Sequence, residues 1–424
     1  MSYLNYNSTN APMTHKLNIS DIAYNSVLET RMTINDFILA VKRFINAPIN
    51  AEVIINSGAT ESIANSIIWG KINHPNGAIY GTEFDHDSVK INAENYKVQY
   101  KILGKEIPHD ASVIMLTHVS GKTGEIFDIN GFMRKFNSHA YLSDRDTTNE
   151  DTLQASVDPI GVRQNRPLVI VDATQSINKL KIDMERLKID GLFFSLHKIG
   201  GPQGFGVFVI KPNIKMPFVP LVGGNQQKKL RGGTLDLAQV ATLQPLLKVK
   251  PLNTKKKWED SVNYLLKNGI EVIKPKGNHL YNTILIHINT CPLGIINRLS
   301  TKYNIFVGAV SACALENEQI VKSNDGFIRL SFNEPNQINN NILDKIIKTI
   351  QKNEEIEEEM NGGFFREDTD TISNITESSS DDDNTKESVD KTQENNIEEL
   401  LNTHEEEDED EDEEVIKESY LEFL

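Results

Sequence analysis

The sequence predicts an α/β protein with a mostly parallel sheet, followed by a smaller α+β unit. Short, β-branched apolar runs alternate with longer mixed segments, as buried parallel strands alternate with helices. Polar or glycine residues follow these runs, where the chemistry of α/β folds collects. From about Leu235 the pattern changes to sparser strands and helices. Together these observations favour a two-part architecture.

Runs of strand length predict the elements of the first sheet, at 53–55, 113–116, 168–171, 192–194 and 207–210. Their composition suits parallel strands buried on both faces, so helices should cover both sides of the sheet. In the second unit, the pattern predicts strands at 284–288 and 327–332, a short helix at 294–303 and a closing helix at 342–351.

The predicted organisation has four parts. An N-terminal arm covers 1–14, a large domain 15–240, a small domain 241–352 and an acidic tail 353–424. Residues 143–166 have no apolar period and are predicted to be an inserted surface loop.

Charge separates the tail from the rest of the chain. Residues 353–424 contain 29 Asp and Glu against 4 Lys and Arg, whereas the preceding 352 residues contain 31 acidic and 40 basic ones. Such a tail buries too little apolar surface to fold alone, so it is predicted to be disordered. Its apolar islands, 397–401 and 420–424, could fold onto a partner, or the tail could lie on the basic body. Its charge argues against binding nucleic acid.

The two cysteines, Cys291 and Cys313, do not form a disulfide framework, and no histidine cluster has metal-ligand spacing. The sequence shows neither a signal peptide nor an apolar run long enough to span a membrane. These features predict a soluble, cytoplasmic protein that binds no metal.

A first candidate site residue is Asp172, which directly follows the run 168–171. A carboxylate there could pair with the pyridine nitrogen of pyridoxal phosphate and make the ring an electron sink. Taken alone, the same residue is more often a cap of the next helix.

A second candidate is Lys198, in Ser195-Leu196-His197-Lys198 after the next strand. A desolvated lysine can form a Schiff base with an aldehyde, and Ser195 and His197 offer groups for a phosphate. The glycine-rich run 200–206 lets the backbone turn tightly beside a cofactor. A lone lysine is usually a surface residue, but this order of motifs after strands makes that alternative weaker.

A third candidate is the segment Gly58-Ala59-Thr60, which follows a strand and opens a predicted helix. The backbone N–H of Ala59 and the hydroxyl of Thr60 suit a phosphate at a helix N-terminus. A plain helix cap is the alternative.

These blocks resemble the class V aminotransferases and, within them, cysteine desulfurases of the NifS type. The resemblance runs from Tyr3 to about Phe332. It includes the opening block 3–9, Asp172-Ala173-Thr174-Gln175-Ser176, the block 195–198, and the pair 223–226 and 231–234. It implies the fold of fold-type I pyridoxal-phosphate transferases, pyridoxal phosphate as cofactor, and a homodimer.

The resemblance also implies roles for single residues. Lys198 would hold the cofactor and shuttle protons, and His86 would stack on the ring. The remaining ligands would be Asp172 for the ring nitrogen, Gln175 for the ring hydroxyl, Ala59, Thr60, Ser195 and His197 for the phosphate, Thr234 for the partner subunit's phosphate, and Arg329 for the substrate carboxylate.

Cys313 distinguishes the desulfurases from other class V enzymes. Its context, Ser311-Ala312-Cys313, resembles the loop that carries the family's nucleophilic cysteine, although free cysteines are usually small buried core residues. Cys291 has no such match and is predicted to be structural. The 16 positions between Cys313 and Arg329 indicate a short loop, which favours sulfur transfer to a partner that approaches the cysteine.

One departure from the family concerns His118-Val119-Ser120-Gly121, where an asparagine is usual in place of Gly121. A contact to the cofactor ring or the substrate could be missing, or Ser120 could supply it.

The prediction is a cysteine desulfurase that converts L-cysteine to L-alanine and passes sulfur from Cys313 to an acceptor protein, such as an iron–sulfur scaffold. Two alternatives stay open. One is another class V reaction, transamination or selenocysteine lysis. The other is a family scaffold that has lost turnover.

Overall fold

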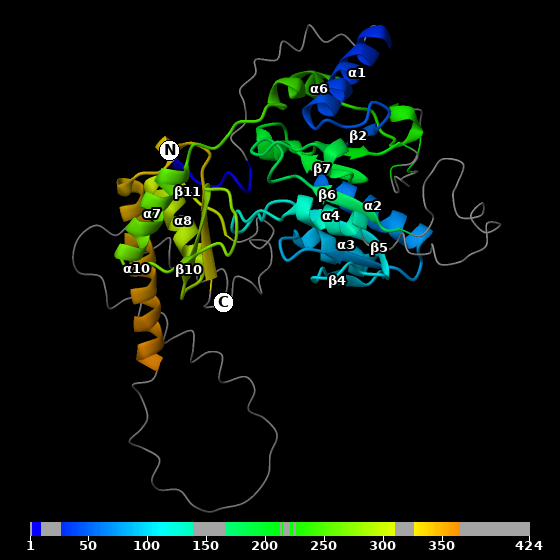
Figure 1. Ribbon diagram of the computed structural model, residues 1–424. Coiled ribbons are helices and arrows are strands. Elements are labelled where there is room, and N and C mark those ends of the chain that lie inside the picture. Colours follow the sequence, from blue (N-terminus) through cyan, green and yellow to red (C-terminus); the bar gives the residue numbers. More distant parts are fainter. Residues whose placement is uncertain are drawn as a thin grey trace, which may run out of the picture.

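The computed structural model describes residues 2–9, 27–138, 166–212, 214, 221, 223, 226–309 and 326–364. Cys313 and the chain after Phe364 lie outside the described residues. So does the predicted loop at 143–166, except for Arg166. The described residues form a large α/β unit and a smaller α+β unit side by side, with the N-terminal strand beside the smaller unit (Figure 1).

The large unit is built on a seven-stranded sheet with the order β2-β8-β7-β6-β5-β3-β4. Its strands are β2 (Glu52–Asn56), β3 (Ala78–Gly81), β4 (Tyr100–Ile102), β5 (Ala111–Thr117), β6 (Leu168–Asp172), β7 (Gly191–Ser195) and β8 (Gly206–Ile210). Neighbouring strands from β7 to β4 are parallel, and β8 is antiparallel to both β2 and β7. The predicted mostly parallel sheet is confirmed.

The prediction that 207–210 is a parallel strand is wrong. Only residues 196–205 connect β7 to β8, and they hold a short 3-10 helix, η4 (Leu196–Ile199), and a glycine turn. A parallel return needs a crossover of about a dozen residues or more, so this short connection reverses the chain.

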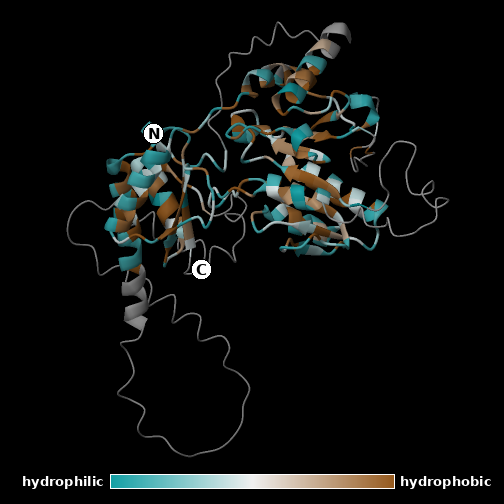
Figure 2. Cartoon of the chain, viewed as in Figure 1, coloured by the Kyte–Doolittle hydropathy of each residue, from teal (hydrophilic) through white to brown (hydrophobic). Residues whose placement is uncertain are grey.

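The strands of the large sheet are buried on both faces. Successive side chains of a strand point to opposite faces, so alternate residues pack into two different hydrophobic cores. In β6, Val169 and Val171 belong to one core, and Leu168 and Ile170 to the other. In Figure 2 the central strands of the large unit are accordingly drawn in brown. This arrangement explains why the strands read as continuous apolar runs.

Helices cover both faces of this sheet. On one face lie α1 (Val27–Phe44), α4 (Ile129–Ser138), α5 (Met184–Leu187) and α6 (Leu237–Leu243), with η6 (Gln244–Leu246); on the other lie α2 (Ala59–Asn73) and α3 (Asp87–Asn95). The 3-10 segment η5 (Gln226–Lys229) lies beside β2, since the Gln227 side chain bonds the backbone of Ile55.

The smaller unit has its own core. Its sheet has the order β12-β10-β9, formed by β12 (Gly326–Ser331), β10 (Thr283–Ile288) and β9 (Val272–Ile273). Its other elements are α7 (Lys255–Lys267), α8 (Pro292–Tyr303), β11 (Ile305–Phe306), η8 (Pro335–Gln337) and α10 (Asn340–Phe364). The two predicted strands and the short helix are therefore present.

The closing helix is longer than the sequence analysis predicted. It was expected to end at Gln351, whereas α10 continues to Phe364. Its apolar stripe includes Ile346 and Ile350 in the small core, and Asn353 beyond it is still only 3% exposed. The acidic residues that follow are good helix formers and continue the helix once this packed part has formed.

The N-terminal segment, residues 2–9, belongs to the structure of the smaller unit although it lies far from it in sequence. Strand β1 (Ser2–Tyr3) pairs in parallel with β11, and Asn5 bridges Ser331. Leu4 is fully buried in the small core. This anchoring places the following residues, 5–9, between the two units.

Candidate active site

The carboxyl ends of five parallel-running strands meet at one edge of the large sheet. Strands β5, β6 and β7 end at Thr117, Asp172 and Ser195. The register pairs Thr117 with Asp172, and Ser195 with Gly206, which in turn pairs with Asn56 at the end of β2. The fifth end, that of β3, leads to His86. The predicted cofactor residues therefore gather at this edge.

Two loops approach each other closely at the start of α2. Gly58, with φ +147°, adopts a conformation that L side chains rarely take, and a Cβ on Gly206 would lie 2.5 Å from the Gly58 Cα. This contact brings the N-terminus of α2 against β7, where the Ala59 N–H donates to Ser195 Oγ at 2.9 Å. Thr60 lies exposed in the first turn of α2. Free N–H groups beside a hydroxyl suit a phosphate.

An ion pair anchors the loop before α6 to the same helix N-terminus. Arg231 Nε and Nη2 donate to the two carboxylate oxygens of Glu61 at 3.0 and 3.1 Å. Arg231 lowers the pKa of Glu61, and so do hydrogen bonds from Ser57, although burial opposes them as the largest single effect. Thr234 is exposed in the turn that this pair holds in place.

Asp172 is a buried carboxylate, 6% exposed. The Thr174 N–H donates to its Oδ1 at 2.8 Å, yet burial raises the pKa of Asp172 above its ordinary value. The Thr174 Oγ1 is buried without a hydrogen-bond partner among the described residues. A buried carboxylate with a raised pKa is stabilised by a cation in contact with it, and a protonated pyridine nitrogen would be such a cation. This environment therefore fits pyridoxal phosphate.

Lys198, in η4, has its ammonium between two backbone carbonyls of the N-terminal segment. Its Nζ donates to Asn7 O at 2.8 Å and to Ser8 O at 2.5 Å. Gln175 Nε2 donates to the same Asn7 carbonyl at 2.9 Å. The N-terminal segment thus joins two predicted cofactor ligands from different loops.

The same segment reaches two further predicted residues. The His197 Nδ1 lies 3.2 Å from Thr9 Oγ1, and burial, with the nearby Lys198 charge, lowers the pKa of His197 to about 4. Arg329, on β12, is 4% exposed and donates to Ser8 Oγ at 2.7 Å. Burial lowers the pKa of Arg329 to about 10, so it is still a cation at neutral pH. The structure therefore brings Lys198, Gln175, His197 and Arg329 together around residues 7–9.

His86 caps α3, with its Nδ1 accepting from the Ser88 N–H at 3.1 Å. Burial lowers the pKa of His86, and the positive charge of Lys198 contributes. The predicted stacking role of His86 stays a prediction.

The position where an asparagine is usual faces the site through its backbone. The Gly121 carbonyl accepts from Arg329 Nη1 at 3.0 Å and from Asn7 Nδ2 at 3.2 Å. Ser120 Oγ accepts from the N–H groups of Lys122 and Thr123, both at 3.2 Å, and so closes its own turn. A Cβ on Gly121 would lie 3.5 Å from Gln175 Nε2, so a longer side chain at this position would extend toward Gln175.

Sequence reasoning assigned no role to Lys179 or Asp85. Lys179 is buried, its Nζ donates to Gln175 O at 2.8 Å, and burial lowers its pKa to about 7, assisted by Lys198. Asp85 accepts from the Thr117 and Thr82 hydroxyls, and burial raises its pKa to about 6. The available signal was their place in the sequence, since Asp85 directly precedes His86 and Lys179 follows Gln175 by four positions.

Residues 5–9 were singled out by their resemblance to the family alone. Nothing local in the sequence reveals their contacts with Gly121, His197, Lys198 and Arg329, because each of these residues lies more than a hundred positions away.

Cys313 lies outside the described residues, between Ala309 and Gly326. Gly308, five positions before Cys313, exchanges two backbone hydrogen bonds with Arg329, at 3.1 and 2.7 Å. The described chain before Cys313 therefore lies beside Arg329. Cys291 lies half-buried at the N-cap position of α8.

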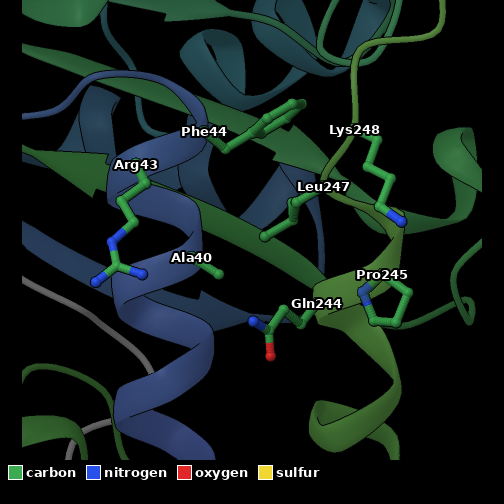
Figure 3. A pocket seen from close by; sticks show the side chains of 7 residues that line it. All are labelled: Ala40, Arg43, Phe44, Gln244, Pro245, Leu247 and Lys248. Carbon is green, nitrogen blue, oxygen red and sulfur yellow. The ribbon is translucent and has the colours of Figure 1, made fainter.

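A separate cavity of about 500 Å³ lies between α1 and η6, and none of the predicted site residues lines it (Figure 3). Among the described residues, no helix is long and apolar enough to cross a membrane.

Comparison with known proteins shows what this chain is similar to. Residues 140–340 match the family model for aminotransferase class-V. A solved NifS-like protein superimposes with a TM-score of 0.65 at 20% identity, covering 84% of this chain and 99% of that one. A NifS-like protein from Rickettsia africae gives a TM-score of 0.62 at 19% identity, covering 84% and 99%. The predicted fold, that of fold-type I pyridoxal-phosphate enzymes, is confirmed.

The curated relatives that match this chain have a more specific name than the family model. A protein named cysteine desulfurase IscS from Psychromonas ingrahamii is 28% identical over 213 residues, which are 45% of this chain and 46% of that protein. One of the same name from Pectobacterium carotovorum is 30% identical over 200 residues, 45% of each chain. The chain thus spans about half the length of the curated relatives it matches.

Proposed function

We propose that this protein is a pyridoxal-phosphate-dependent cysteine desulfurase. The observation that carries the proposal is that the N-terminal segment binds both Lys198 and Arg329, while Asp172 ends β6 and its pKa responds to the charge of Lys198; the three offer a buried anion, an amine and a buried cation. A ring with a basic nitrogen, an aldehyde, and an amino-acid carboxylate are complementary to these three groups. The similarity to proteins named cysteine desulfurase supports the choice of L-cysteine as substrate.

The residues would hold the cofactor as follows. The Ala59 N–H, Thr60, Ser195 and His197 would bind its phosphate, and Asp172 would keep its ring nitrogen protonated. Gln175 would bond the ring hydroxyl and His86 would stack on the ring. When bound, pyridoxal phosphate supplies an electron sink for the bond changes at the substrate's α-carbon.

Lys198 would hold the aldehyde carbon of the cofactor and then move the substrate's α-proton. Its two carbonyl partners, Asn7 O and Ser8 O, orient the Nζ atom in the site. Arg329 would bind the substrate carboxylate and so orient the α-carbon toward Lys198.

Cys313 would be the nucleophile. Its thiolate would attack the sulfur of L-cysteine, the carbon–sulfur bond would break, and L-alanine would leave after proton uptake, with a persulfide left on Cys313. The sulfur would then pass to an acceptor protein, such as an iron–sulfur scaffold. We further propose a cytoplasmic homodimer, in which Thr234 of one subunit reaches the phosphate site of the other.

A direct test is the production of L-alanine from L-cysteine by the protein loaded with pyridoxal phosphate. Cys313→Ala should abolish this activity, whereas the matched control Cys291→Ala should keep it. Equal loss in both variants, or full activity of Cys313→Ala, would contradict the assignment of Cys313. Selenocysteine as substrate in place of cysteine separates lysis of that amino acid from desulfuration.

A further inference from the structure

The guanidinium of Arg329 is held by side chains as well as by backbone. Nη2 donates to Ser8 Oγ at 2.7 Å and to Asn5 Oδ1 at 3.2 Å, and Nη1 donates to the Gly121 carbonyl at 3.0 Å. The Ser8 hydroxyl in turn donates to Asn5 Oδ1 at 2.7 Å. Ser8 therefore uses its hydroxyl both as an acceptor from the arginine and as a donor to Asn5.

The backbone makes room for this cluster. A Cβ on Gly308 would lie 2.3 Å from Asn5 Oδ1 and 3.0 Å from Arg329 Nη2. Only a glycine at this position lets both side chains lie against the bridge between 308 and 329. The arrangement of Asn5, Ser8 and Arg329 is thus built into the packing of the smaller unit.

The geometry of a guanidinium makes Nη2 the decisive atom. A carboxylate binds in bidentate fashion through two parallel N–H groups along one edge, formed by Nη2 with either Nη1 or Nε. Nη2 has two N–H groups, and in the described part of the chain it donates to Ser8 Oγ and Asn5 Oδ1. A carboxylate that forms a bidentate pair with Arg329 must therefore displace one of these oxygens.

We infer that Ser8 is a specificity-determining residue, whose hydroxyl competes with the substrate carboxylate for Arg329 Nη2 and so weakens the binding of amino acids. The inference rests on the proposed function, in which Arg329 binds the carboxylate of an amino acid. It goes beyond that function by assigning the affinity of the carboxylate subsite to a side chain of the N-terminal segment.

The consequence for affinity follows from the free state. In Ser8→Ala, the Nη2 of a buried cation loses its hydrogen bond to Ser8 Oγ, which destabilises the free protein, whereas the complex with a carboxylate keeps its contacts. Ligands with a carboxylate should therefore bind more tightly to the variant. Ligands without one should bind as before, because they do not use Nη2.

The test uses the protein loaded with pyridoxal phosphate and a matched pair of ligands, L-alanine and ethylamine, which differ by the carboxylate. Dissociation constants are measured from the change in cofactor absorbance. For Ser8→Ala we expect the constant for L-alanine to fall about 3- to 10-fold and that for ethylamine to stay unchanged. Ser8→Thr, which keeps the hydroxyl, should match the wild type, as should Ser2→Ala, which removes a hydroxyl from the same segment.

An unchanged or increased constant for L-alanine in Ser8→Ala would overturn the inference. An equal shift for ethylamine would overturn it too, since it would show a general effect of the segment on the site. In both cases the wild type would still respond to L-alanine, and the proposed function would stand. A wild-type protein that responds to neither L-alanine nor L-cysteine would overturn the proposed function together with the inference.

Discussion

On the large unit, Asp172 and Ser195 end strands of the sheet and Lys198 follows three residues later, whereas on the smaller unit Arg329 lies within β12. The first group is positioned by strands of a sheet that has a hydrophobic core on each of its two faces. Arg329 is positioned by residues 5 and 8, more than three hundred positions away. The places of Asp172 and Lys198 in the proposed cofactor half thus follow strand ends along the chain, whereas the proposed substrate half, Arg329, lies where contacts with the distant N-terminal segment hold it.

This difference explains what the sequence could predict. Asp172 and Lys198 could be proposed as site residues from their places after strands, because the carboxyl ends of parallel strands share one edge, and the resemblance to the family then supplied their roles. The predicted direction of β8 was wrong, because an apolar run of strand length does not reveal whether the strand is parallel or antiparallel to its neighbours. The contact of Ser8 with Arg329 could not be predicted, since a hydrogen bond between residues 321 positions apart leaves no local pattern.

The largest expected effect comes from the substrate half. Arg329→Lys removes the planar fork of a buried cation, and a lysine cannot form a bidentate pair with a carboxylate. We expect kcat/KM for L-cysteine to fall about 100-fold or more. Arg298→Lys, which changes a buried arginine on α8, is the matched control. A fall of less than threefold in Arg329→Lys, measured by alanine production, would show that the carboxylate binds elsewhere.

An intermediate effect, on stability and cofactor retention, is expected where the backbone at Gly206 lies close to the backbone at Gly58 in the cofactor half. In Gly206→Ala the added Cβ would meet the Gly58 backbone at 2.5 Å, so either β8 or the start of α2 must shift. We expect a loss of about 1–3 kcal/mol in the free energy of unfolding and weaker retention of pyridoxal phosphate. Gly104→Ala is the control, because a Cβ there meets nothing within 4 Å. Urea unfolding and dialysis against buffer measure the two quantities, and equal behaviour of both variants would refute the close approach.

An effect of similar size concerns the pH dependence of stability. Burial lowers the pKa of Lys179 to about 7, whereas in the unfolded chain it returns to its ordinary value of 10.5. Between these values the unfolded state binds more protons, so this residue makes stability rise with pH, by up to about 1.4 kcal/mol per pH unit. In Lys179→Met that contribution should vanish, and urea midpoints at pH 7 and pH 9 should differ less than in the wild type. Identical differences in the two proteins would mean that Lys179 is charged when buried.

The central claim is that Lys198 holds pyridoxal phosphate at the edge of the large sheet. The measurement that tests it most directly is the absorbance spectrum of the purified protein, incubated with pyridoxal phosphate, before and after L-cysteine, for wild type and Lys198→Ala. We predict a band near about 420 nm in the wild type that changes with L-cysteine and that is absent or unresponsive in the variant. A wild type without any such band would contradict the claim.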